Sequence, residues 1–113
     1  MKKLIYATKK HPDGFTMKRN GVYAKPKTGY FVALTDNRIK RVNKKTLSPL
    51  KSQAKQLEKM TGKEIMYGYW KDGQEHCLDL SIHTKNLGQA KSIGKLFKQK
   101  AIYSCKKQDS IYL

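Results

Sequence analysis

Acidic residues are scarce in this chain, and their scarcity is informative. Of the 113 residues, 8 are aspartate or glutamate and 25 are lysine or arginine, which gives a formal net charge of +17. This balance argues against a protein that mimics DNA, because such a mimic must carry negative charge. It also argues against a nuclease that holds Mg²⁺ in a carboxylate cluster, because the few acids are scattered along the chain.

Cysteines and long apolar runs are also few. Cys77 and Cys105 do not suffice for a disulfide framework, and no Cys-x-x-Cys motif is present. The apolar stretch Leu4–Ala7 is too short for a signal peptide, and no run approaches the roughly 18 apolar residues of a membrane span. We therefore expect reduced thiols, no metal or cofactor, no membrane partner and a cytoplasmic location.

Turn-forming residues divide the first part of the chain into short β-prone runs. The predicted strands there are Leu4–Thr8, Phe15–Lys18 and Gly21–Ala24. A tight hairpin across Asp36-Asn37 is predicted to join Tyr30–Thr35 to Arg38–Val42.

Two helices and two further hairpins are predicted in the rest of the chain. Ser48-Pro49 favours a helix start, Gly62 favours its end, and a second helix is expected over Lys85–Lys100. The Asp72-Gly73 turn is predicted to join Glu64–Lys71 to Gln74–Ile82. The last predicted strand pair is Ala101–Cys105 with Ser110–Leu113.

The predicted register of the Asp72-Gly73 hairpin separates two faces. It pairs Tyr69 with His76 and Tyr67 with Leu78 on an apolar face, and it places Trp70 on the other face. Residues 1–113 are therefore expected to form a single small α+β domain, an antiparallel sheet built from hairpins with two helices on one face.

Lysines recur at four-residue spacing on both predicted helices, next to the apolar stripe. Like charges in this arrangement repel by roughly 0.2–0.5 kcal/mol per pair, and only Glu58 offsets them on the first helix. A bound polyanion would relieve this repulsion, and the run Arg38–Lys45 adds a further basic patch. The predicted phosphate-binding residues are Arg38, Lys40, Arg41, Lys51, Lys55, Lys59, Lys91, Lys95 and Lys98.

The cations are 22 lysines and only 3 arginines. Arginine reads guanine edges with two hydrogen bonds, whereas lysine acts as a point charge. The composition therefore favours contact with the phosphate backbone over sequence readout, on DNA or RNA. Trp70 is the best candidate for stacking on a base.

The sequence does not predict a catalytic site. Asp79, Ser81 and His83 alternate on one predicted strand face, where an acid, a hydroxyl and a base could meet. The sequence shows neither the strained nucleophile turn nor the oxyanion site that acyl transfer needs. His76 and Cys77 are adjacent on a strand and point to opposite faces, which argues against a shared metal ion.

Isolated positions along most of the chain resemble small uncharacterised proteins carried by bacteriophages and mobile elements. The matching positions are Gly14-Phe15-Thr16, Gly29–Leu34, Gly68–Gly73, Leu78–Ser81, Ala90, Gly94 and Gln99–Tyr103. The resemblance implies a role in host takeover, in counter-defence or in the virion, and it carries over no catalytic residues.

Two functions therefore remain open. The first is a non-enzymatic, backbone-directed nucleic-acid-binding protein, encoded by a phage and located in the host cytoplasm or the virion. The alternative is an interaction protein whose basic face blocks an acidic surface of a host or defence protein, as a counter-defence inhibitor would. The steepness with which binding weakens in salt distinguishes the two.

Overall fold

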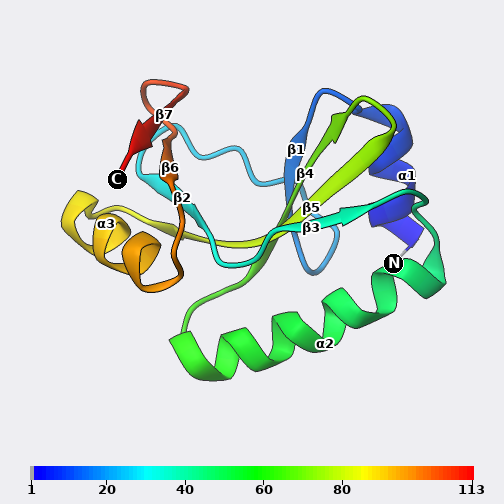
Figure 1. Ribbon diagram of the computed structural model, residues 1–113, viewed down its shortest axis with the longest axis horizontal. Helices are drawn as coiled ribbons and strands as arrows, with labels where there is room; N and C mark the ends of the chain where they lie inside the picture. The colour runs from blue at the N-terminus through cyan, green and yellow to red at the C-terminus, as the bar shows by residue number, and fades with distance from the viewer. Residues whose placement is uncertain (1) are drawn as a thin grey trace.

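Strand β5 is the centre of the fold, and the other strands build one antiparallel sheet around it. The computed structural model describes residues 2–113 and shows an α+β architecture of three helices and seven strands (Figure 1). The elements are α1 (Lys2–Lys10), β1 (Phe15–Lys18), β2 (Tyr30–Ala33), β3 (Asn37–Ile39), α2 (Lys44–Thr61), β4 (Met66–Asp72), β5 (Glu75–Thr84), α3 (Leu87–Leu96), β6 (Ala101–Ser104) and β7 (Asp109–Tyr112). The strand order is β1-β4-β5-β2-β6-β7, and β3 also pairs with β5.

The β4–β5 hairpin is confirmed, but its register differs from the prediction by two residues. The loop is Gly73-Gln74, with Gly73 at φ 61°, and Tyr69 pairs with Leu78. Only the first loop residue has a positive φ, which excludes the type I′ turn expected for Asp72-Gly73. Side chains alternate with period two, so a shift of two residues leaves every side chain on its predicted face.

The predicted hairpin between Tyr30–Thr35 and Arg38–Val42 is wrong. Strands β2 and β3 do not pair with each other; they follow one another along the same side of β5. Leu34 donates its backbone N–H to the Leu80 carbonyl, and the Leu80 N–H donates to the Thr35 hydroxyl. Between β2 and β3 the chain has one residue more than the facing part of β5, so the hydrogen-bond ladder is interrupted in the manner of a β-bulge. The ten residues of β5 are enough to pair with both strands.

The N-terminal segment is a helix and not the predicted strand. Leu4, Ala7 and Thr8 are buried in α1, and their spacing puts them on one helical face. Strand β1 has the predicted bounds, whereas Gly21–Ala24 contributes only an isolated bridge between Tyr23 and Met17.

The two predicted helices exist with different bounds. Helix α2 begins five residues before Pro49, because Asn43 and Thr46 form a reciprocal capping box, and it ends at Gly62 with φ 67°. Helix α3 is shorter than predicted: Asn86 caps its start, and Lys98 beyond its end has φ 57°. The last strand pair is confirmed as β6 and β7.

One face of the sheet holds the core, and the helices pack against it. Helix α2 runs along this face in Figure 1, and α3 lies beside β2 and β6. The core comprises Leu4, Ala7, Met17, Val32, Leu34, Leu47, Leu50, Ala54, Leu57, Ile65, Tyr67, Tyr69, Leu78, Leu80, Ile82, Ala90 and Ile102. The other face carries Trp70, as predicted. Within residues 2–113, no helix is long and apolar enough to cross a bilayer.

Candidate nucleic-acid interface

In the part of the chain that the structure describes, no lysine has an acidic partner. Within residues 2–113 the ion pairs are Arg19 with Glu58, at 2.6 Å, and Arg38 with Asp72 and Glu75, at 3.0 and 3.9 Å. Every one of these pairs uses an arginine. Ordinary protein surfaces mix both charge signs, so a surface of unpaired lysines is suited to a polyanionic partner.

The helical lysines predicted to bind phosphate lie on the side of the sheet that α2 and α3 cover. Lys51, Lys55 and Lys59 are exposed on α2, and Lys91 and Lys95 are exposed on α3. The sixth residue of this set, Lys98, is exposed just after the end of α3.

The remaining predicted phosphate contacts lie along β3 and the segment that follows it. Lys40 and Arg41 are exposed between β3 and α2. Arg38 is held by acids instead: its guanidinium donates to Asp72, and this hydrogen bond raises the pKa of Arg38. Arg38 is therefore less available to phosphate than Lys40 and Arg41.

Trp70 lies apart from the helical lysines. Its side chain is 44% exposed, on the face of β4 opposite to the core. The sheet therefore stands between Trp70 and the lysines of α2 and α3, and the sequence-predicted residues form two surfaces. The helical lysines form one surface. The other has the aromatic ring for a base, and Arg38 also lies on it, because Arg38 and Trp70 both pair with Cys77.

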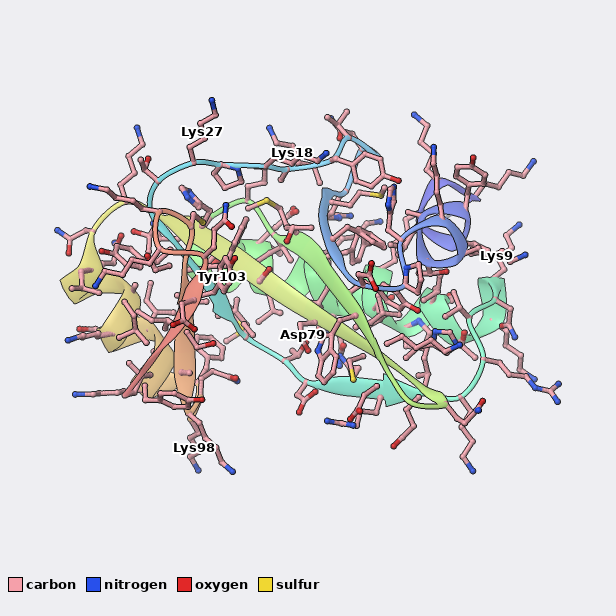
Figure 2. The ribbon with its side chains drawn as sticks, turned by 90° about the horizontal axis from the view of Figure 1, so that it is seen from above. Lys9, Lys18, Lys27, Asp79, Lys98 and Tyr103 are labelled. Atoms are coloured by element: carbon pink, nitrogen blue, oxygen red, sulfur yellow. The ribbon has the colours of Figure 1, made fainter. Side chains whose placement is uncertain are left out.

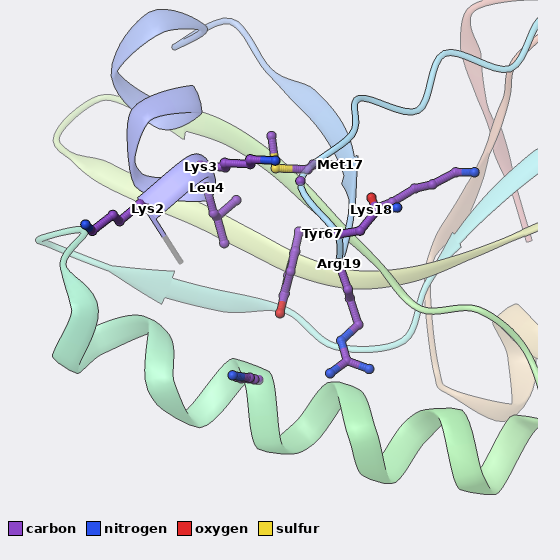
Figure 3. A pocket seen from close by; sticks show the side chains of 10 residues that line it. Lys2, Lys3, Leu4, Met17, Lys18, Arg19 and Tyr67 are labelled. Carbon is purple, nitrogen blue, oxygen red and sulfur yellow. The ribbon is translucent and has the colours of Figure 1, made fainter.

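A basic pocket of about 380 Å³ lies between α1, the turn after β1 and α2 (Figure 3). Its cationic residues are Lys2, Lys3, Lys18, Arg19 and Lys51. In Figure 3 the side chains of Lys2 and Lys18 extend away from each other at opposite sides, and Arg19 projects towards α2. Of these five residues only Lys51 was predicted from the sequence, because α1 brings Lys2 and Lys3 to the pocket and the turn after β1 brings Lys18 and Arg19.

The turn after β1 sets the shape of the basic pocket. The Lys18 N–H donates to the Val22 carbonyl and the Gly21 N–H donates to the Lys18 carbonyl, which closes the turn tightly. Gly21 has φ 89°, and a Cβ there would collide with the side chain of Lys3. Glycine at this position therefore permits both the backbone conformation and the close approach of α1.

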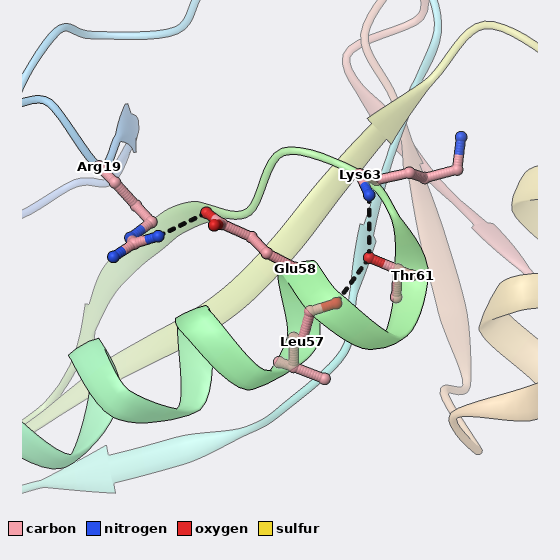
Figure 4. A network of polar contacts seen from close by, with 5 residues as sticks. All are labelled: Arg19, Leu57, Glu58, Thr61 and Lys63. Atoms are coloured by element: carbon pink, nitrogen blue, oxygen red, sulfur yellow. Dashed lines mark hydrogen bonds and ion pairs between the residues drawn. The ribbon is translucent and has the colours of Figure 1, made fainter.

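The Arg19–Glu58 pair fixes this turn to α2 (Figure 4). Nearby, the Thr61 hydroxyl donates to the Leu57 carbonyl at 2.7 Å and accepts from the Lys63 N–H at 3.2 Å. These bonds satisfy backbone groups at the end of α2, and Glu58 lies in that last part of the helix. The hydrogen bond to Glu58 raises the pKa of the Arg19 guanidinium, so this cation is partly neutralised at the pocket.

A second hollow, the sheet cleft, lies on the uncovered face of the sheet and has a volume of about 470 Å³. Its lining includes Phe31, Ala33, Gly68, Trp70, Asp79, Ser81 and Tyr103. Oδ1 of Asp79 is buried and accepts no hydrogen bond from any residue that the structure describes. Burial, and then the nearby Asp36, raise the pKa of Asp79 to about 6, although Arg38 acts in the opposite direction.

Asp79, Ser81 and His83 do not form the catalytic arrangement that their alternation on one strand would allow. His83 Nε2 lies 2.8 Å from the Thr28 carbonyl oxygen, so this nitrogen points to the loop before β2. Within residues 2–113 no group of three His, Cys, Asp or Glu residues could hold a metal ion. Burial raises the pKa of both cysteine thiols, which disfavours the reactive thiolate.

Comparisons with known proteins give no further indication of function. No protein-family model matches the chain. No curated protein and no solved structure matches it either. The basic surface and the sheet cleft therefore carry the functional inference.

Proposed function

We propose that this protein binds the phosphate backbone of nucleic acid, without an enzymatic step and with little dependence on sequence. The observation that supports this proposal is the absence, within residues 2–113, of any lysine in an ion pair. Lysine contacts to phosphate release condensed counterions, which makes such binding favourable and independent of the bases.

The placement of Lys51 supports one path for the backbone. Lys51 belongs to the lysine stripe of α2 and also lines the basic pocket. The stripe from Lys51 to Lys59 is about 12 Å long at the helical rise. A backbone that follows α2 therefore reaches the cations of α1 and of the turn after β1 at the start of this stripe.

A phage or mobile element is the proposed source, and the host cytoplasm or the virion the proposed location. A phage protein of this kind would coat or compact nucleic acid during host takeover. The alternative, a basic inhibitor that blocks an acidic protein surface, uses the same lysines and is an outcome of the following test.

The test is the salt dependence of binding to random single-stranded and double-stranded oligonucleotides, measured by fluorescence anisotropy. About six phosphate contacts predict a slope near −5 for log K against log salt concentration on duplex DNA. Weak binding at low salt with a shallow slope would overturn the proposal and favour the protein-blocking alternative. Purification in high salt, followed by absorbance at 260 nm, ensures that no host nucleic acid already occupies the lysines.

A further inference from the structure

The sheet cleft has a floor of small residues between aromatic walls. Gly68 on β4, Ser81 on β5 and Ala33 on β2 line it on the uncovered face of neighbouring strands. Ala33 pairs directly with Ser81, and the next cross-strand pair on this face joins Phe31 to Tyr103. The small side chains leave a hollow where larger ones would fill the surface, and aromatic rings stand at its ends.

Asp79 lies next to Trp70 in this cleft. Trp70 pairs with Cys77, and Gly68 pairs with Asp79, so Trp70 and Asp79 are diagonal neighbours on one face. Diagonal neighbours lie about 7–8 Å apart. A flat ring stacked on Trp70 would therefore present its edge to the carboxylate, because Gly68 has no side chain to fill the space between them.

The carboxylate determines which ring fits. An ionised aspartate only accepts hydrogen bonds, and Oδ1 of Asp79 has no donor among residues 2–113. A buried carboxylate with an unpartnered oxygen is costly, and Asp79 lines the cleft, so a ligand that supplies an N–H to this carboxylate is favoured. A small organic cation could supply one, but the net charge of +17 repels it. The same charge attracts a neutral ring attached to a polyanion.

We propose that the sheet cleft binds an unstacked nucleobase of a single-stranded nucleic acid, with Trp70 stacking on the ring and Asp79 accepting from its exocyclic amino group. This inference rests on the proposed nucleic-acid binding and adds a preference to it. Cytosine offers an N4 amino donor to an acidic side chain, whereas thymine and uracil present carbonyl oxygens there, which repel a carboxylate. Antiparallel sheets with exposed aromatics bind single strands in this manner.

The surroundings of the cleft can hold the backbone of such a strand. Figure 2 shows this face with Asp79 and Tyr103 near its centre, while Lys18 and Lys27 project along one edge and Lys98 along another. Lys18 also lines the basic pocket, and Thr16, two residues before it on β1, lines the sheet cleft. Phosphates at these edges would leave the bases free to turn towards the sheet.

The test uses Trp70 as the reporter, because it is the only tryptophan in the chain. The fluorescence of Trp70 is titrated with single-stranded octamers of deoxycytidine and of deoxythymidine at pH 7.5. Both probes carry the same charge, so a difference between them reports the base. We expect quenching by both octamers, and an affinity for the cytosine octamer roughly tenfold higher, the effect of one charge-assisted hydrogen bond.

Two variants and a control test the assignment. Asp79→Asn should reduce the cytosine preference at least severalfold. Gly68→Val should weaken the binding of both octamers, because its side chain fills the floor of the cleft. The fold should tolerate this change, since a Cβ at Gly68 makes only ordinary contacts of 3.8 Å and more. Glu64→Gln removes the same charge from an exposed position outside the cleft and should change neither measurement.

The outcomes separate the inference from the proposed function. The base site would be overturned if both octamers bound with equal affinity and if Asp79→Asn and Gly68→Val did not change that affinity. Salt-sensitive binding in that case would leave the proposed backbone binding intact. Absence of binding to any oligonucleotide at low salt would overturn both. Circular dichroism spectra of the variants that match that of the wild type exclude misfolding as the cause of a loss.

Discussion

Arg19 and Glu58 are joined by a 2.6 Å contact between Nη1 and Oε1, which ties the turn after β1 to helix α2. The two side chains remain 24% and 35% exposed, so water screens the pair. Glu58 is also the only acid on α2, beside the lysine stripe and the basic pocket. The pair therefore contributes to the position of the turn while it opposes the binding of an anion.

Replacing Glu58 with Gln should have opposite effects on stability and on binding. The free energy of unfolding should fall by less than about 1 kcal/mol, the range of a screened ion pair. The affinity for a random oligonucleotide should rise roughly twofold to fivefold, because Arg19 is freed and a negative charge is removed. Denaturant unfolding and fluorescence anisotropy measure the two quantities. Glu64→Gln is the matched control, and an equal rise there would assign the effect to net charge alone.

Gly73 is the second position where a substitution gives a clear expectation. Its φ of 61° is in the left-handed region, and a Cβ there would meet no atom within 4 Å. Gly73→Val should therefore lower the stability by about 1–2 kcal/mol through backbone strain alone. Gln74→Val changes the other loop residue, which has no positive φ, and should cost less. Thermal unfolding compares the two variants, and equal losses would show that the positive φ is not the cause.

The turn also shows how far the sequence determines the fold. A hairpin near Asp72-Gly73 and the face of Trp70 could be predicted, because alternation fixes which residues share a face. The register could not, since Gly73 suits either the first or the second loop position and the two choices differ by two residues. The same side chains are buried in both registers, so hydrophobic patterning does not distinguish the two registers.

The other predictions that were wrong depended on contacts between segments far apart in the sequence. Leu4, Ala7 and Thr8 have the spacing of a helical face, but the short run with Ile5 and Tyr6 also suits a strand. Strands β2 and β3 were predicted to pair because they are adjacent in sequence, yet the long β5 offers both a partner. The basic pocket is formed by α1 and by the turn after β1, whose approach to α2 the sequence does not reveal, so its cations other than Lys51 could not be assigned to one site.

Asp79 should make the stability depend on pH in a defined direction. Burial raises its pKa from the ordinary 3.8 to about 6, with Asp36 adding to the rise and Arg38 opposing it. The folded protein therefore binds this proton more tightly than the unfolded chain. Protonated Asp79 therefore contributes to the free energy of unfolding. This contribution, on the order of 2–3 kcal/mol, is fully present below about pH 4 and is lost as the pH rises through 6.

The comparison of wild type with Asp79→Asn isolates this contribution. The variant keeps a neutral side chain of the same shape, so it should match the wild type near pH 4 and be more stable at pH 7. His76, whose pKa is lowered by burial and by Lys71, titrates in both proteins and cancels in the difference. Asp13, which also lines the cleft, is unchanged in the variant. Denaturant unfolding from pH 4 to 7 gives the difference curve, and a flat curve would contradict the buried state of Asp79.

Charge reversal on the helices tests whether binding is localised. Lys51, Lys55 and Lys59 reversed to Glu form one triple, and Lys91, Lys95 and Lys98 reversed to Glu form a second. The control triple reverses Lys9, Lys106 and Lys107, which are exposed in α1 and in the β6–β7 connection. Each triple lowers the net charge equally. The α2 reversals leave a like-charge repulsion of similar size within the helix, so helix stability changes little.

We expect the α2 triple to weaken oligonucleotide binding most, because Lys51 is shared with the basic pocket. The α3 triple should also weaken binding strongly, since α3 packs on the same face of the sheet as α2. The control triple should retain more of the affinity and of the salt slope, because each lost phosphate contact reduces the slope on duplex DNA by about one. Anisotropy titrations at several salt concentrations measure both quantities. If the three triples lost affinity equally, net charge alone would explain binding, and the lysines of α2 and α3 would not form a distinct surface.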